Sequence, residues 1–177
     1  AIQLYTLRDF CKTVPDLEKT AKKVKKIGYK AVQASGIGVA PSEAKKVFTD
    51  NGLTVCATHE SSDLILKNPG EACERLHQIG TTHTAYPWPA GIDFTRKTEV
   101  QNLAKRLNAA GKVFAKNGCT LSYHNHALEF VRFGKATVHD YIYESTYPAY
   151  LKAELDTYWV HVIGGDSAPW LNKVKRR

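Results

Sequence analysis

One stretch of the sequence joins a buried strand to a cluster of potential ligands: Gly118-Cys119-Thr120-Leu121-Ser122-Tyr123-His124-Asn125-His126-Ala127-Leu128-Glu129-Phe130. Gly118 can end the long helical pattern that precedes it, and residues 119–123 have the character of an inner strand. Two imidazoles, an amide and a carboxylate then follow within six residues. In parallel α/β folds, chemistry collects where strands end and loops begin. The stretch therefore predicts half of an active site, with a hydrogen-bonded polar corner as the alternative.

Outward from this stretch, strand-like and helical segments alternate about six times along the chain. Helix-to-strand junctions share a glycine that can end each helix. Such alternation indicates parallel strands joined by crossover helices. The glycines are Gly28, Gly52, Gly80 and Gly118, and the predicted strands are 2–5, 29–34, 53–58, 81–86, 119–123 and 150–155.

Two architectures fit this alternation, an open doubly wound sheet and a β/α barrel. The sequence has neither a Gly-x-Gly-x-x-Gly after the first strand nor a phosphate-binding Gly-x-x-x-x-Gly-Lys-[Ser/Thr], which weakens the open sheet. Polar groups at nearly every strand end favour a barrel, whose loops converge on one mouth. A complete barrel needs eight units and about 250 residues. We therefore expect 1–177 to form a single (β/α) TIM barrel domain with about six of eight units, in a natural protein that continues past Arg177.

Composition excludes several classes of protein. Hydrophobic residues make up 43% of the chain and charged residues 24%, as in ordinary globular proteins. No apolar run approaches about 18 residues, so we expect neither a membrane span nor a membrane partner. The four widely spaced cysteines contain no Cys-x-x-Cys pair and predict thiols, with Cys56 and Cys119 buried in strands. Thiols and the lack of a signal-peptide pattern favour a reducing, cytoplasmic location.

The formal net charge of +8 raises the alternative of a nucleic-acid partner. The positive charge falls largely in two helical segments, near 19–26 and 173–177, with little aromatic residue content around them. A solvated helix face is therefore favoured over a nucleic-acid surface.

Four segments carry a resemblance to a known family: Gln3-Leu4-Tyr5-Thr6-Leu7-Arg8-Asp9, Gly28-Tyr29-Lys30-Ala31-Val32-Gln33, Tyr123-His124-Asn125-His126-x-x-Glu129-Phe130 and Leu155-Asp156-x-x-Trp159-Val160. Together they resemble the sugar phosphate isomerase/epimerase family of xylose isomerase-like TIM barrels. The likeness spans nearly the whole chain in the right order, and the third segment is the most specific, to one branch. The resemblance implies a divalent-metal site at the carboxyl-terminal mouth of the barrel.

The resemblance also implies which side chains hold the metal. Asp156 matches the ligand at the end of strand six. At strand five His124 stands where relatives have Glu, and Glu129 follows five residues later, so the ligand is His124, Glu129 or both. The remaining ligands would lie beyond Arg177. Mn²⁺, Zn²⁺, Co²⁺ and Mg²⁺ are not distinguished by these residue types.

Isomerising or epimerising a sugar requires removal of a proton next to a carbonyl, and a metal stabilises the resulting enediolate. A carboxylate or imidazole moves the proton, which makes His126 and Glu129 the catalytic candidates. Candidate substrate contacts share a position near a strand end: Arg8, His59, Trp88 and Trp159. Each has a structural alternative, which is a hydrogen bond for the histidines, a salt bridge for Arg8 and packing under loops for the tryptophans.

Three functions remain open from the sequence. The leading one is a metal-dependent sugar, sugar phosphate or keto-sugar isomerase or epimerase with a small-molecule substrate. An endonuclease-IV-like DNA repair enzyme shares the implied fold but uses a multi-zinc cluster with more ligands than the strand ends offer here. A non-catalytic sugar-binding barrel is the third, motivated by His124 in place of Glu. Barrels of this type often associate, so a homo-oligomer is open as well.

Overall fold

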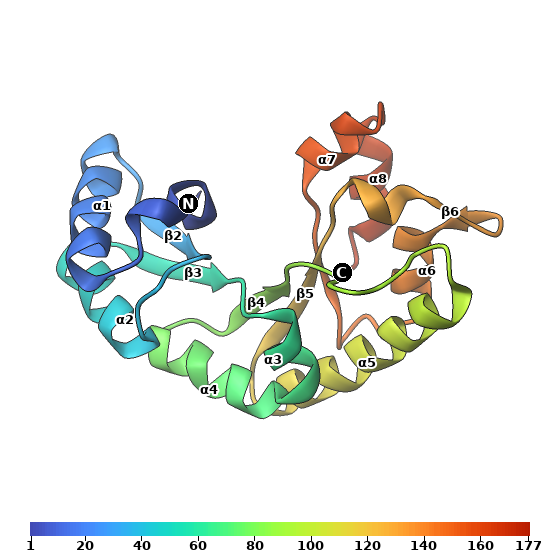
Figure 1. The fold of residues 1–177 in the computed structure, drawn as a ribbon, viewed down its shortest axis with the longest axis horizontal. Helices are drawn as coiled ribbons and strands as arrows, with labels where there is room; N and C mark the ends of the chain where they lie inside the picture. Colours follow the sequence, from blue (N-terminus) through green and yellow to red (C-terminus); the bar gives the residue numbers. More distant parts are fainter. The chain divides into compact units, whose positions relative to one another are not determined.

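Six parallel strands form one sheet in the computed structural model, which describes residues 1–177 (Figure 1). Their order in the sheet follows their order in the chain, without the reversal that marks a doubly wound sheet. Sequential parallel strands with crossover helices are the arrangement of a β/α barrel, so the predicted fold class is confirmed. In sheet order the strands are β1 (Ile2–Gln3), β2 (Ala31–Ala34), β3 (Thr54–Thr58), β4 (His83–Tyr86), β5 (Thr120–His124) and β8 (Lys152–Glu154).

Four helices end at or just before the glycines that were predicted to end them, Gly28, Gly52, Gly80 and Gly118. The first helix starts after Thr13, whose hydroxyl accepts a hydrogen bond from the Asp16 backbone N–H at 3.3 Å. It ends at Gly28, which has a φ of 113° that favours glycine. The helices are α1 (Val14–Ile27), α2 (Pro41–Asp50), α3 (Ser62–Lys67), α4 (Pro69–Ile79), α5 (Lys97–Lys116), α6 (Val138–Glu144), α7 (Thr157–Val162) and α8 (Ser167–Val174).

The first of two compact units comprises Ala1–Glu60 and Glu71–Thr84. Its strands pair in parallel, and β3 meets β4 where the Thr58 hydroxyl donates to the Thr84 hydroxyl at 2.9 Å. Helices α1 and α2 pack against each other. Apolar residues of these helices and strands form the core, which includes Leu17, Ala21, Val24, Val32, Ala44, Phe48 and Ile79.

The second unit comprises Ser61–Gly70 and Ala85–Arg177. Its longest helix, α5, packs an apolar face against β5. Strands β5 and β8 pair in parallel, with His124 opposite Glu154 in the register. A 3₁₀ helix η2 (Ala127–Phe130) follows β5, and a short antiparallel hairpin, β6 (Arg132–Phe133) with β7 (Ala136–Thr137), comes next.

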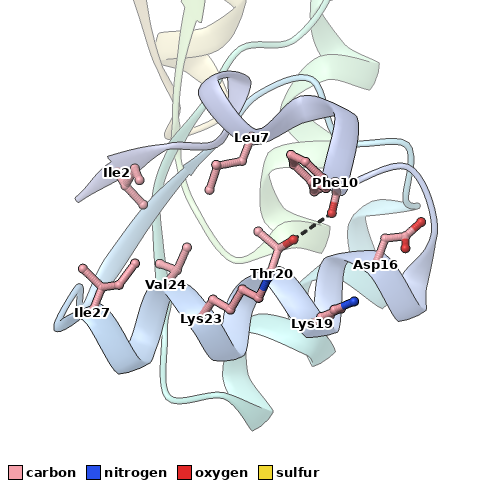
Figure 2. A pocket seen from close by; sticks show the side chains of 9 residues that line it. All are labelled: Ile2, Leu7, Phe10, Asp16, Lys19, Thr20, Lys23, Val24 and Ile27. Carbon is pink, nitrogen blue, oxygen red and sulfur yellow. Dashed lines mark hydrogen bonds between the residues drawn. The ribbon is translucent and has the colours of Figure 1, made fainter.

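Several details differ from the sequence-based predictions. The strand expected at 2–5 ends at Gln3, and Leu4–Phe10 form the 3₁₀ helix η1, on which the Arg8 guanidinium donates to the Tyr5 carbonyl at 2.9 Å. The Thr20 hydroxyl of α1 donates to the carbonyl of the last residue of η1, Phe10, at 2.8 Å (Figure 2). Cys56 is exposed on β3, not buried, since side chains alternate along a strand, and its thiol donates to the Val32 carbonyl at 3.2 Å.

Other features were either absent from the predictions or agree with them. Helices α3 and α7 and the β6–β7 hairpin were not predicted. The four cysteines form no disulfide, as predicted. None of the helices combines the length and apolar composition that crossing a membrane requires.

Candidate metal and substrate site

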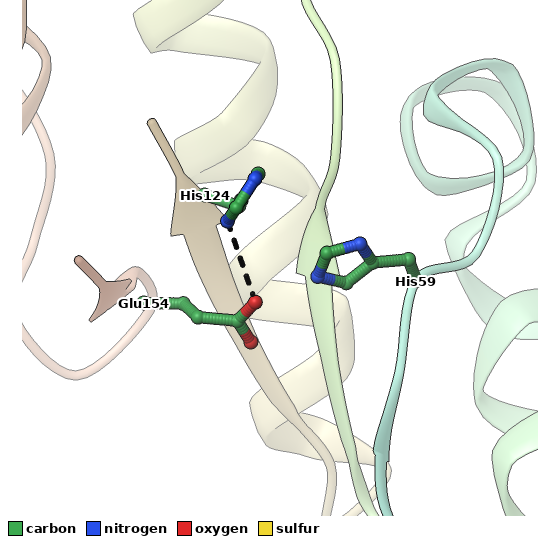
Figure 3. Close-up of side chains that lie close together, drawn as sticks. All are labelled: His59, His124 and Glu154. Carbon is green, nitrogen blue, oxygen red and sulfur yellow. Dashed lines mark ion pairs between the residues drawn. The ribbon is translucent and has the colours of Figure 1, made fainter. Parts of the chain in front are cut away.

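The imidazole of His124 lies between two carboxylates at the carboxyl ends of β5 and β8. Its Nδ1 atom is 3.5 Å from Glu154 Oε1 (Figure 3), and its Nε2 atom is 3.8 Å from Asp156 Oδ2. The side chain of His124 is only 10% exposed, whereas each carboxylate is 30% exposed. The parallel register of β5 and β8 produces this grouping, because it sets His124 directly opposite Glu154.

Asp156 is held in place by the start of α7. Its Oδ1 atom accepts a hydrogen bond from the Tyr158 backbone N–H at 2.9 Å, so this carboxylate caps the helix. Its backbone is joined to Asn125 by two hydrogen bonds, one from the Asp156 N–H at 2.8 Å and one to the Asp156 carbonyl at 3.2 Å. Asn125 therefore fastens the loop after β5 to the loop after β8, and the second oxygen of Asp156 faces His124.

Three aromatic rings surround His126 beside this group. Its ring centroid lies 4.8 Å from that of His124, 4.7 Å from Trp88 and 5.3 Å from Trp159. Trp88 is half-exposed, and the hydroxyl of Ser62 donates to its backbone carbonyl. The structure thus brings two predicted substrate contacts, Trp88 and Trp159, to the predicted catalytic residue His126. Flat apolar faces with a polar group between them suit the stacking of a sugar ring.

Glu129 is fully buried below His126. Its Oε1 atom accepts a hydrogen bond from the Tyr123 hydroxyl at 2.9 Å, and its Oε2 atom accepts one from the His126 backbone N–H at 2.7 Å. Burial raises the pKa of the Glu129 carboxyl, and burial together with the nearby Glu129 raises the pKa of Tyr123 well above its usual value. Both oxygens of Glu129 therefore accept hydrogen bonds from residues next to the candidate site. The Nε2 atom of His124 faces Asp156, not Glu129.

The other predicted substrate contacts belong to the first unit. Arg8 is exposed, donates to the Tyr5 carbonyl at 2.9 Å and lies over the Tyr5 ring, 4.5 Å from its centroid. His59 follows β3, and its backbone N–H donates to the Ala34 carbonyl at 3.3 Å. Their roles toward a substrate stay predictions.

Glu154 was missed by the sequence-based reasoning. It is the last residue of β8 and comes two residues before Asp156, which was predicted as a ligand from its motif. An acidic residue at the last position of a short strand was the available signal, since the carboxyl ends of parallel strands share one edge. The pairing of Glu154 with His124 could not be predicted, because it depends on the register between two strands.

The His124 imidazole can offer one nitrogen to a divalent metal ion beside one carboxylate at a time, Nδ1 beside Glu154 or Nε2 beside Asp156, because its two nitrogens point in diverging directions. Mixed nitrogen and oxygen ligands suit Zn²⁺, Mn²⁺ or Co²⁺, and Mg²⁺ favours sites richer in oxygen. The exposed fractions of Glu154 and Asp156 leave one side of the group open to a substrate. The group could therefore hold an ion and still admit a ligand.

A scan against models of protein families finds no match, and a search of curated proteins finds none either. Solved structures match over almost the whole chain. A sugar phosphate isomerase/epimerase from Parabacteroides distasonis aligns with a TM-score of 0.85 at 21% identity, covering 99% of this chain and 71% of that chain. The fold is that of xylose isomerase-like TIM barrels.

Other proteins with this fold act on different substrates. An AP endonuclease of family 2 from Brucella melitensis aligns with a TM-score of 0.69 at 14% identity, covering 98% of this chain and 74% of that chain. The 3-keto-D-glucoside 4-epimerase YcjR from E. coli aligns with a TM-score of 0.64 at 16% identity, covering 90% and 70%. Because one fold carries both kinds of enzyme, the reaction has to be argued from the site.

Proposed function

We propose that this protein is a metal-dependent isomerase or epimerase of a small sugar, sugar phosphate or keto-sugar. The observation that carries the proposal is the His124 imidazole between the Glu154 and Asp156 carboxylates at the ends of two paired parallel strands. The sugar isomerase/epimerase among the similar structures supports the substrate class. The keto-glucoside epimerase supports a reaction next to a carbonyl carbon.

His124 would hold the ion together with one carboxylate, Glu154 if it binds through Nδ1 or Asp156 if it binds through Nε2. When bound, a divalent ion supplies the positive charge that stabilises an enediolate formed from the substrate. Asp156 is pre-positioned for this role by its bond to the Tyr158 N–H and by Asn125, so little ordering is needed when an ion binds.

His126 is the proposed proton carrier at the α-carbon. It lies beside His124 and between Trp88 and Trp159, where a stacked sugar would place its ring carbons. An imidazole has an ordinary pKa close to neutrality and can accept and return a proton. Glu129 fixes the backbone of His126 and so sets where that ring lies. We retain Glu129 as a second catalytic candidate.

The substrate would stack against Trp88 and Trp159 with its apolar face and direct its oxygens toward the carboxylate group. Arg8 and His59 remain proposed contacts from the first unit, Arg8 for a phosphate or carboxylate and His59 for a hydroxyl. A homo-oligomer remains an open proposal.

Metal analysis of the purified chain tests the ligand set. We expect close to one equivalent of a divalent metal. His124→Ala and the variant of the carboxylate that binds the ion, Asp156→Asn or Glu154→Gln, should lower the affinity by roughly 100-fold or more, beyond the effect of losing an outer contact. Asp166→Asn is the matched control, because Asp166 caps α8 as Asp156 caps α7 and has no imidazole beside it. Measuring His59→Ala alongside asks whether the first unit contributes to binding.

Proton exchange tests the chemistry separately. A protein of the proposed kind should exchange the α-hydrogen of a keto-sugar for deuterium from solvent, followed by NMR, and His126→Gln should slow exchange by roughly 100-fold or more. Failure of the reconstituted wild type to bind any divalent metal would overturn the metal-dependent mechanism and leave a sugar-binding barrel.

A DNA repair enzyme is the second candidate. Its support is the net charge of +8 and the AP endonuclease among the similar structures. Binding to DNA with an abasic site should then weaken steeply as salt rises, because bound phosphates release counterions. Several zinc ions per chain together with cleavage of that DNA would replace the isomerase proposal.

A further inference from the structure

An ion pair shielded from solvent lies just past the carboxyl end of β3 in the first unit. The Arg75 Nε atom on α4 donates to Glu60 Oε2 at 2.7 Å, and the Glu60 side chain is only 10% exposed. By contrast, the ion pair between Lys46 and Asp50 joins two side chains one turn apart on the exposed face of α2. The Glu60–Arg75 pair therefore joins two separate elements, the end of β3 and α4.

Hydrogen bonds also hold the backbone on both sides of His59, which directly precedes Glu60. The Glu60 N–H donates to the Thr84 hydroxyl at 3.1 Å, and that hydroxyl donates to the Thr58 carbonyl at 3.1 Å. The His59 N–H donates to the Ala34 carbonyl at the end of β2 at 3.3 Å. Thr84 thus holds residues 58 and 60, and β2 holds the residue between them.

Glu60 sets the side to which the His59 imidazole points. The Glu60 carboxylate turns toward α4, where it meets Arg75. Adjacent side chains along an extended chain point to opposite sides. The imidazole of His59 therefore faces away from α4, at the carboxyl edge of the sheet, where β/α barrels place the groups that contact substrate.

Stability alone does not account for a shielded ion pair at this position. Removing charges from water costs about as much as their attraction returns, so apolar residues of similar volume stabilise a fold equally well. What the Glu60–Arg75 pair adds is direction, because the planar guanidinium of Arg75 bonds a carboxylate in a defined geometry. A directional contact beside a candidate substrate residue suits the task of holding that residue.

We propose that Glu60 and Arg75 are positioning residues, which hold the His59 imidazole in the direction that a sugar hydroxyl requires. The inference rests on the proposed function, in which His59 contacts the substrate. Arg75 holds Glu60, and Glu60 fixes the backbone from which the imidazole projects. A ring held in one rotamer before the substrate arrives loses less conformational entropy on binding, which strengthens the contact.

The rotamer of His59 can be measured on the full chain without any substrate. In NMR, the three-bond coupling between its backbone nitrogen and its Cγ atom reports the χ1 angle. The wild type should give the value of a single rotamer, and Glu60→Met/Arg75→Met should give an average over rotamers. This double variant leaves neither charge buried alone, so it should remain folded. Lys46→Met, which breaks an exposed ion pair, is the control and should leave the coupling unchanged.

Substrate binding gives a second readout, with a 3-keto-D-glucoside as the probe in the deuterium-exchange assay. Glu60→Met/Arg75→Met should raise KM roughly tenfold, the loss of about one hydrogen bond, and leave kcat within about threefold. In a His59→Ala background the same double variant should have no further effect on KM, because the residue that it positions is gone. A merely structural pair would raise KM equally in both backgrounds.

The two readouts separate this inference from the proposed function. An averaged coupling in the wild type, an unchanged coupling in the double variant, or an equal rise of KM with and without the His59 imidazole would overturn the positioning role. Absence of exchange by the wild type would count against the proposed function, and the coupling would then decide the positioning role. Thermal unfolding checks each variant. If the double variant does not fold, Arg75→Lys, which keeps the charge without the planar guanidinium, takes its place.

Discussion

Tyr123→Phe removes one hydroxyl from the base of the candidate site and deprives a buried carboxylate of a donor. Glu129 is fully buried, and the Tyr123 hydroxyl lies 2.9 Å from its Oε1 atom. The phenyl ring fills the same volume, so no cavity is expected. The variant therefore isolates one hydrogen bond, and Tyr143→Phe is the control, because the Tyr143 hydroxyl donates to the neutral Tyr123 carbonyl at 3.2 Å.

The expected magnitudes follow from the charge of each acceptor. A buried hydrogen bond to a charged group contributes about 2 kcal/mol, and a neutral one about 1 kcal/mol. For a chain of 177 residues, 1 kcal/mol shifts the melting temperature by about 2–4 °C. Tyr123→Phe should lower it by about 4–8 °C and Tyr143→Phe by about 2–4 °C. Burial raises the pKa of Glu129, and the Tyr123 hydroxyl opposes that rise, so the cost of Tyr123→Phe should diminish as Glu129 is protonated at acid pH.

Tryptophan fluorescence is the suitable assay, because all three tryptophans, Trp88, Trp159 and Trp170, lie in the second unit with Tyr123 and Glu129. Urea unfolding followed at these residues at neutral and at acid pH gives both the cost and its pH dependence. A Tyr123→Phe cost no larger than that of Tyr143→Phe, or one that is unchanged between the two pH values, would refute an ionised Glu129 held by this hydroxyl.

Two further predictions concern the same unit. Gly111→Ala should lower the free energy of unfolding by about 1–3 kcal/mol, because an added Cβ would collide with the Tyr150 carbonyl. Gly70→Ala in α4 is the control, since no atom lies within 4 Å of its Cβ. In urea unfolding it should be neutral or stabilising by up to about 1 kcal/mol. Burial lowers the pKa of His139 from 6.5 to about 4. Between these pH values the unfolded chain binds a proton at His139 that the folded chain does not. The free energy of unfolding should therefore fall as pH drops from 6.5 to 4, by up to roughly 3 kcal/mol. His139→Leu should flatten that fall in unfolding free energy; an unchanged slope would contradict the assignment.

Much of the fold could be predicted from the sequence, because the local signals that start and end its helices agree with the tertiary structure. Thr13 and Pro15 start α1, and Gly28 ends it in a backbone conformation that favours glycine. The 3₁₀ helix at Leu4–Phe10 escaped prediction, because Ile2–Tyr5 has the composition of a strand. Its turn is seen in the backbone of the folded chain, for example in the bond from the Cys11 N–H to the Arg8 carbonyl at 3.3 Å.

Within the candidate site, the chemical types of residue could be anticipated but their partners could not. The sequence alone indicated that His124, His126 and Asp156 follow parallel strands, since strand ends concentrate polar groups at one edge. The tertiary structure decided that Glu154 faces His124 and that Glu129 turns toward Tyr123. The physical reason is that periodicity along one segment fixes the face of a strand, whereas the register between strands and the packing of loops depend on residues distant in sequence.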